Sequence, residues 1–191
     1  MRFQHALATG SVALVLALTG CADSESASGK GFNDVDVDFA TDMIQHHAQA
    51  LEMVDLTMDR DLDPEVAELT EEIRAAQAPE IETMADWLEE WDEPVPETSR
   101  DHANAHGDGG DMDTDMPGMM SADDMAALEE APDAEFQDMW LQMMIEHHEG
   151  AVEMAEVEVE DGQHDKAVAL AEEIIAAQQE EIATMQDLLT P

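Results

Sequence analysis

The chain has 191 residues, and its 48 Asp and Glu residues against 6 Lys and Arg residues give a formal net charge of −42. So acidic a chain is a poor partner for nucleic acid, whose phosphates are bound by basic surfaces. The charge would concentrate cations, which suits metal capture, but it also suits solubility in a salty or acidic habitat. The absence of Tyr and the abundance of Ala, Glu, Leu, Met and Gln disfavour strands and favour helices.

Residues 1–20 are the first predicted element, a secretory signal peptide. Arg2 precedes an apolar run over residues 6–18 that is too short to span a membrane. Thr and Gly then lead to Cys21, the only cysteine, in a sequence that resembles a bacterial lipobox. We therefore expect cleavage before Cys21, a lipid on Cys21 that anchors the protein to the membrane, and a polar tether over residues 21–33. With this anchor, the predicted location is the extracytoplasmic face of the bacterial cell membrane, in the periplasm or at the cell surface. The alternative is an ordinary signal peptide followed by a chance cysteine.

Two long segments of the chain repeat one another. Residues 39–88 align without a gap with residues 140–189 when the sequence is shifted by 101 positions. Met43-Ile44-x-His46-His47 returns as Met144-Ile145-x-His147-His148, and Glu71-Glu72-Ile73-x-Ala75-Ala76-Gln77 returns as Glu172-Glu173-Ile174-x-Ala176-Ala177-Gln178. So long an ungapped match indicates an internal duplication.

Each copy is predicted to form two helices, over residues 34–91 and residues 133–189. Steps of three and four place one face of the first helix at Phe39, Met43, His46, Ala50 and Met53, and in the second copy at Trp140, Met144, His147, Ala151 and Met154. The second helix of the first copy is expected over Pro64–Trp91, with Asp63 as its cap. The second helix of the other copy is expected over His164–Leu189. The inward residues expected on the former include Leu69, Ile73, Ala76, Ile81, Met84 and Leu88, and Pro79 predicts a kink.

The expected fold is all-α, a four-helix bundle made of the two duplicated hairpins. An amphipathic hairpin cannot bury its apolar stripe alone, so the copies should pack together about a pseudo-two-fold axis. They can pair within one chain or between the two chains of a homodimer. Residues 92–132 form a polar linker between the copies, with a short helix over Asp123–Ala131 capped by Ser121.

The duplicated histidine pairs are the main candidate metal ligands. Adjacent helical residues point about 100° apart, so only one histidine of each pair can face the bundle axis. His46 and His147 lie on the apolar stripe beside methionines, whereas His47 and His148 flank it. Imidazole suits copper, zinc and iron, and thioethers shift the preference toward Cu(I). We predict a copper centre, with iron, manganese or zinc as alternatives, whose candidate ligands are His46, His47, His147, His148, Met43, Met53, Met144 and Met154.

Two glutamates are duplicated along with the histidines. Glu80 and Glu181 could hydrogen-bond a ligating histidine, or they could belong to a solvated helix face. The alternative is that no metal is bound: the histidines are buried and hydrogen-bonded to glutamate, and the methionines fill the core.

The linker contains a second candidate metal-binding segment: His102, His106, Met112, Met116, Met119 and Met120. Methionines in an Asp/Gly/Pro stretch have no helical face to fill, so exposed thioethers on a flexible linker indicate soft-metal capture. The alternative is a low-complexity linker with no ligand.

These motifs resemble the bacterial secreted family known as domain of unknown function 305, a ferritin-like group of paired two-helix repeats with a His-His motif. The resemblance covers nearly all of residues 34–189 and is most specific at Met43–His47 and Met143–Ala151. It implies a ferritin-like bundle and an envelope location, and copper binding through His and Met has been proposed for some members. One departure is that Asp36, an acidic residue three before the aromatic Phe39, has Gln137 as its equivalent.

Three functions fit the sequence. The first is a non-catalytic protein for copper binding, sequestration or homeostasis, with no catalytic residues. The second is a di-iron or di-manganese oxidoreductase, but such bundles use Glu-x-x-His motifs and the chain has none. Asp42 lies one turn before His46, yet its equivalent is Met143, so a symmetric carboxylate-bridged site is hard to build. The third is a metal-free interaction module of the envelope.

Overall fold

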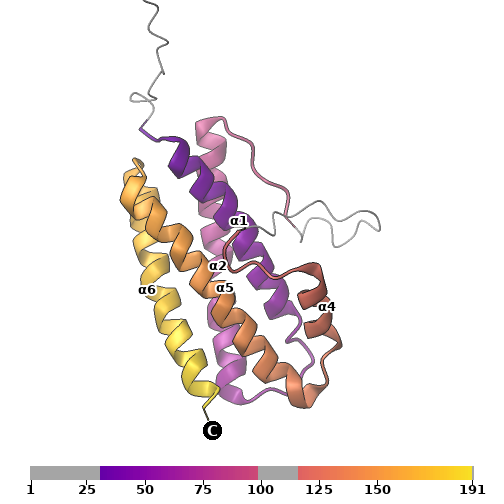
Figure 1. The fold of residues 1–191 in the computed structure, drawn as a ribbon. Coiled ribbons are helices and arrows are strands. Elements are labelled where there is room, and N and C mark those ends of the chain that lie inside the picture. Colours follow the sequence, from indigo (N-terminus) through magenta and orange to yellow (C-terminus); the bar gives the residue numbers. More distant parts are fainter. Residues whose placement is uncertain (1–30, 99–115, 191) are drawn as a thin grey trace, which may run out of the picture.

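The computed structural model describes residues 31–98 and 116–190, which are helical with no strand among them. Helices α1 (Asp34–Asp55) and α2 (Pro64–Trp91) form one hairpin, and α5 (Asp133–Asp161) and α6 (Asp165–Leu188) form the other. Figure 1 shows the two hairpins side by side in one bundle, with α1 packed on α5. The predicted all-α bundle of two hairpins is confirmed, and both hairpins come from the same chain.

Several predicted features fall outside the described residues. These are the signal peptide over residues 1–20, the lipidation site Cys21, most of the tether, and the linker residues His102, His106 and Met112. Within the described part of the chain, no helix is both long and apolar enough to cross a membrane.

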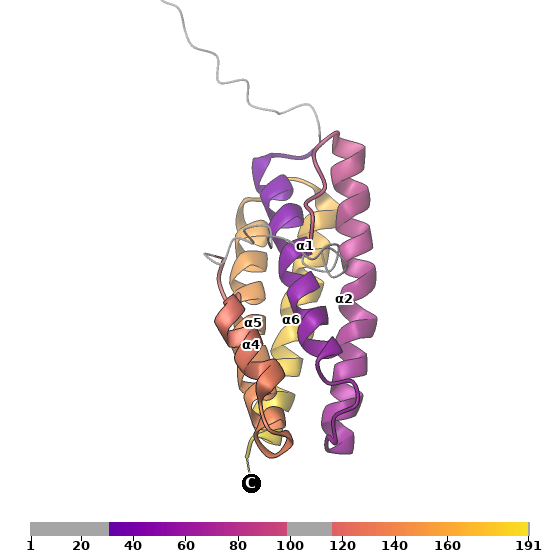
Figure 2. The ribbon, with the colours of Figure 1, turned by 90° about the vertical axis from the view of Figure 1, so that its right-hand side faces the viewer.

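The short helix α4 (Ala122–Glu130) begins with the predicted cap. Ser121 and Asp124 form a capping box, in which each side chain accepts a hydrogen bond from the other residue's backbone N–H. This satisfies two of the donors that a helix start leaves free. Figure 2 shows α4 on the outside of the bundle against α5.

Helix α2 begins where the sequence predicted, but Asp63 does not cap it with its side chain. The Asp63 carboxylate instead accepts a hydrogen bond from Gln137 Nε2 at 3.1 Å, and Gln137 Oε1 accepts one from the Asp63 backbone at 2.8 Å. The prediction of a side-chain cap was wrong because Gln137 of the neighbouring helix α5 binds the Asp63 carboxylate instead. Helix α2 continues through Pro79 to Trp91.

The core forms two clusters along the bundle, and each cluster contains residues of both α1 and α5. Met43 of α1 packs with Ala151 and Ala155 of α5 in one cluster, and Met144 of α5 packs with Ala50 of α1 in the other. Residues late in α1 therefore meet residues early in α5, so the two helices run antiparallel. Positions 46 and 147 lie between the clusters, at the centre of the bundle.

The buried face of α2 differs from the predicted one at position 76. Ala76 and Ile81 are only partly buried, whereas Gln77 is 2% exposed. The buried stripe of α2 follows steps of four through Leu69, Ile73 and Gln77, which places position 77 inside and position 76 beside it. A polar amide thus occupies a core position that the apolar pattern had assigned to its neighbour.

Candidate metal centre

The His46 and His147 rings lie against each other in the middle of the bundle. Their ring centroids are 3.7 Å apart with an interplanar angle of 39°, and the residues are 0% and 1% exposed. One residue comes from α1 and the other from α5, at equivalent positions of the two copies. The antiparallel crossing of these helices therefore brings two imidazoles to the pseudo-two-fold axis.

The hydrogen bonds of this pair are incomplete. His46 Nε2 lies 3.1 Å from the Pro117 carbonyl oxygen, and because a carbonyl can only accept, Nε2 carries the proton. Among the described residues, His46 Nδ1 and both ring nitrogens of His147 have no partner at good hydrogen-bonding geometry, and the His46 backbone near the His147 ring only partly offsets the lowering of the His147 pKa. Three buried nitrogens without partners are costly in a core unless something else binds them.

Both central imidazoles are held in the neutral form. Burial, followed by the charge of His47, lowers the pKa of His46 from 6.5 to about 3. Burial, followed by the charge of His46, lowers the pKa of His147 well below its ordinary value. A neutral imidazole has a free lone pair, which is the form that binds a metal ion.

His47 and His148, the second histidine of each motif, each bond to a glutamate of the other helix of their hairpin. His47 Nε2 donates to Glu80 Oε2 of α2 at 2.8 Å, and His148 Nε2 donates to Glu181 Oε2 of α6 at 2.9 Å. Both histidines are fully buried, and within the described residues the Nδ1 atom of each has no partner. Each glutamate thus fixes the tautomer and the orientation of one ring, as carboxylates do for metal-ligating histidines.

The candidate methionines of the helices lie in the core of the bundle. Met43, Met53 and Met144 are 0% exposed, while Met154 is partly buried against the cluster that contains Met43. Met43 and Met144 each lie about one turn before a central histidine on the same helix. Their thioethers are therefore near the centre along the helix, and packing alone already accounts for their burial.

The linker methionines are not all where they were expected. Met116 is 9% and Met120 is 5% exposed, and Met119 is partly buried, so the expectation of exposed thioethers is wrong for these residues. The reason is that residues 116–120 are bonded to the bundle. Gln49 of α1 donates to the Met120 carbonyl at 2.9 Å and accepts from the Met120 N–H at 2.7 Å.

The interior polar residues that were not singled out from the sequence include three glutamines. Gln77 and Gln178 are 2% and 3% exposed and are equivalent in the two copies, and atoms of both amides lack partners in the described part of the chain. Their exact repetition at the 101-residue shift was a signal that they serve the interior of both hairpins. The third is Gln49, whose role depends on the linker and leaves no trace in the repeat.

The centre is built from imidazoles rather than from bridging carboxylates. Among residues 31–98 and 116–190, no three or more His, Cys, Asp or Glu side chains are grouped so as to hold a metal ion. Glu80 and Glu181 bond to His47 and His148 instead of converging with each other. This arrangement disfavours a di-iron or di-manganese site, which needs several shared carboxylates.

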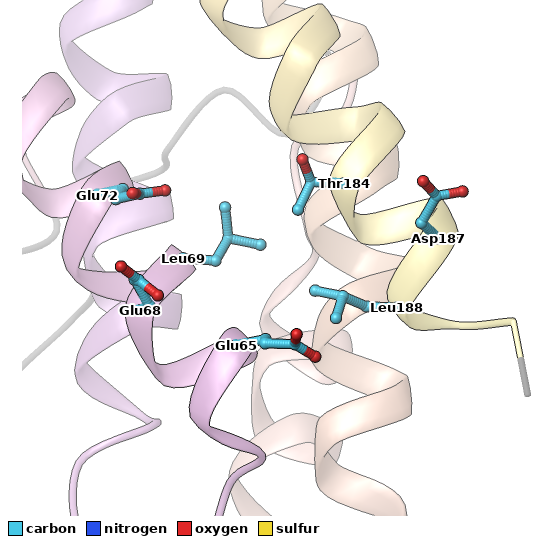
Figure 3. A pocket seen from close by; sticks show the side chains of 7 residues that line it. All are labelled: Glu65, Glu68, Leu69, Glu72, Thr184, Asp187 and Leu188. Atoms are coloured by element: carbon cyan, nitrogen blue, oxygen red, sulfur yellow. The ribbon is translucent and has the colours of Figure 1, made fainter.

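An open acidic groove lies elsewhere, between α2 and α6. It has a volume of about 570 Å³ and is lined by Glu65, Glu68, Leu69, Glu72, Thr184, Asp187 and Leu188. Figure 3 shows the three glutamates on α2 facing the three residues of α6. None of the predicted metal ligands lines it.

The sequence and the fold are similar to those of known proteins. The family model described as "Domain of unknown function (DUF305)" matches residues 36–189. The chain belongs to the DUF305 family. No protein with a curated function matches the sequence.

Solved structures of similar proteins share the DUF305 fold. A DUF305 protein from Streptomyces coelicolor, described as secreted, is 34% identical, with a TM-score of 0.69 over 81% of this chain and 90% of the other. A DUF305 fragment from Deinococcus radiodurans is 29% identical, with a TM-score of 0.70 over 82% of this chain and 96% of the other. CopM in its Cu(I)-bound form is 28% identical, with a TM-score of 0.62 over 80% of this chain and 94% of the other. CopM has also been solved in Cu(II)-bound and Ag-bound forms.

Proposed function

We propose that this DUF305 protein binds copper outside the cytoplasm and sequesters it or passes it on. The observation that carries the proposal is the His46–His147 pair, with rings 3.7 Å apart, both buried and both neutral. Three of their four nitrogens have no partner at good hydrogen-bonding geometry in the described residues. A metal ion bound by the unpartnered ring nitrogens would satisfy atoms that the protein otherwise buries at a cost.

Copper is the metal that the surroundings favour. Neutral imidazoles and thioethers suit Cu(I), whereas iron and manganese sites of helical bundles rely on carboxylates. The similar protein CopM was solved with Cu(I), Cu(II) and Ag, which supports a soft metal. The proposed ligands are His46 and His147, with Met43, Met144 and the Nδ1 atoms of His47 and His148 nearby.

The proposed location is the extracytoplasmic face of the membrane. The signal peptide over residues 1–20 and a lipid on Cys21 would place the bundle there. The description of the Streptomyces coelicolor relative as secreted agrees with an extracytoplasmic site. Such a protein needs no reactive nucleophile, and its task would be binding rather than catalysis.

The test is a copper competition measurement. The chain without residues 1–20, with Cys21→Ser to remove the thiol, is titrated with Cu(I) and Cu(II) against chelators of known affinity. We expect affinity tighter than micromolar, and its loss in the His46→Ala/His147→Ala double variant. His164→Ala is the control, because His164 contacts Trp87 and Trp91 at one end of the bundle. Equal affinity in the double variant and the unmodified chain would rule the proposed centre out.

A further inference from the structure

Residues 116–120, which we name the strap, lie across the helices that hold the central histidines. Figure 1 shows the segment leading into α4 running over α1 and α5. The strap contacts α1 through the Pro117 carbonyl, which accepts from His46, and through Met120, which exchanges two hydrogen bonds with Gln49. On α5 its backbone at Pro117 and Gly118 lies directly against Gly150. It thus spans the junction of the two copies at the central pair.

The strap contacts the two copies at equivalent positions in different ways. Gln49 and Gly150 are equivalent positions, since 150 − 49 = 101. On the first copy, the Gln49 side chain binds the strap, and on the second, the missing side chain of Gly150 makes room for it. A Cβ at position 150 would collide with the Pro117 carbonyl. A Cβ at Gly118, whose φ is +74°, would lie 2.7 Å from the Glu146 carbonyl oxygen.

The histidines are closed off from solvent in this arrangement. His46, His47, His147 and His148 are each at most 1% exposed, so an ion can reach them only when part of the protein moves. Helices α1 and α5 share both core clusters, and separating them would expose most of the core. The strap is held by three hydrogen bonds, a short backbone contact and the buried side chains of Met116 and Met120, and Met120 belongs to the core cluster that contains Met144. Moving these five residues away uncovers His46 at a smaller loss of packing than separating α1 from α5.

We propose that the strap is the access gate of the histidine centre and that Gln49 is the positioning residue that holds it closed. The inference rests on the proposed function for its metal, but the closure itself is a property of the protein alone. Removing the two Gln49 hydrogen bonds should raise the open population about ten- to hundredfold, because each contributes a modest net stabilisation.

The first experiment tests the gate without metal. Gln49→Leu is compared with Gln137→Leu, which also removes two hydrogen bonds between a helix and a loop, at Asp63. Gln137 lies about 15 Å along α5 from His147, ten residues away. Histidine modification by diethyl pyrocarbonate, mapped by mass spectrometry, should be about tenfold faster or more at His46 and His147 in Gln49→Leu only. Equal rates in the two variants, or no change in either, would overturn the gate.

The second experiment measures the kinetics of metal passage. Cu(I) is transferred to the protein from a coloured chelator, and back again to excess chelator. In Gln49→Leu we expect uptake and release to accelerate by a similar factor, with the equilibrium affinity changed less than either rate. A loss of affinity with unchanged uptake would show that the strap positions ligands instead of controlling access. If no variant binds Cu(I) while Gln49→Leu still exposes His46 and His147, the gate stands and the proposed function fails.

A second variant guards against misfolding of the first. Gly150→Ala acts from the opposite helix, where its methyl group would push Pro117 away. It should accelerate modification of His46 as Gln49→Leu does, with the helical content unchanged by circular dichroism. Slow modification in a folded Gly150→Ala protein would contradict the proposal.

Discussion

The two copies of the hairpin are alike at the centre and different at their ends. At the centre, the His47–Glu80 and His148–Glu181 bonds are 2.8 and 2.9 Å long and are related by the repeat. At one end, Asp36 accepts hydrogen bonds from the backbone of Gln163 and His164, where α6 begins. The repeat places Gln137 at the corresponding position of the other end, bonded to Asp63, where α2 begins. Both residues hold the start of a second helix, one with a carboxylate and one with an amide.

A second substitution makes the difference between the ends larger. Glu158, which is 0% exposed, lies against Asp36, whereas its equivalent Thr57 bonds its hydroxyl to the Val54 carbonyl. One end therefore buries two neighbouring carboxyl groups, whereas the equivalent positions at the other end hold an amide and a hydroxyl group. The comparison teaches that the two copies share the hydrogen bonds between histidine and glutamate. At the ends of the bundle, equivalent positions hold different side chains and make different hydrogen bonds.

The largest expected effect concerns the shared contacts. Glu80→Gln and Glu181→Gln keep the shape of the side chain but remove the charge that orients His47 and His148. If the copies act equally in metal binding, each variant should weaken copper affinity about 10- to 100-fold, by a similar factor. The measurement is chelator competition, with Glu82→Gln as the control because Glu82 is exposed on α2. A strong effect in one copy alone would break the functional symmetry.

The next effect concerns the end that differs. Burial, and then the nearby Asp36 carboxyl group, raise the pKa of Glu158 from 4.5 to about 8. Between these values the folded state holds a proton that the unfolded chain has released, so stability falls as the pH rises from 4.5 to 8. Glu158→Gln, which mimics the protonated acid, should remove this part of the decline and raise the melting temperature at the alkaline end.

Thermal unfolding of the metal-free protein across that pH range measures the effect. The matched control is Glu160→Gln, an exposed residue on the same helix, which should leave the pH dependence unchanged. The central histidines contribute with the opposite sign. The lowered pKa of His46 means that stability is lost as the pH falls from 6.5 toward 3. An unchanged slope in Glu158→Gln would show that the carboxyl pair is solvated and ionised.

Much of the bundle and part of the centre could be predicted because the repeat and the helical period are local patterns. The period placed His46 and His147 inside, and the duplication singled out Glu80 and Glu181 as partners for histidine. The burial of Glu158 also had a signal, since it continues the stripe of Ala151 and Ala155 in steps of three and four. The position of the strap left no signal in the sequence. It depends on a long-range contact between Pro117, which lies outside the repeat, and Gly150.

The last prediction concerns the two aromatic positions of the repeat, which hold different residues in the two copies. Trp140 Nε1 donates to the Met53 carbonyl at 2.8 Å, and Met53 lies in the last turn of α1, where carbonyls have no helical partner. The equivalent of Met53 is Met154, which lies seven residues before the end of α5, so its carbonyl is within reach of the helix's own N–H groups. Phe39, the equivalent of Trp140, needs no donor there.

Trp140→Phe should therefore lower the free energy of unfolding by about 1 to 3 kcal/mol, because it leaves the Met53 carbonyl buried without a donor. Phe39→Trp should bring no compensating gain, since the added N–H would find no free carbonyl and the larger ring would strain the core. Urea denaturation of both variants measures the two effects. A stabilising Phe39→Trp would show that the second copy also has an unused acceptor, and that the length of α1 is not what sets the two aromatic residues apart.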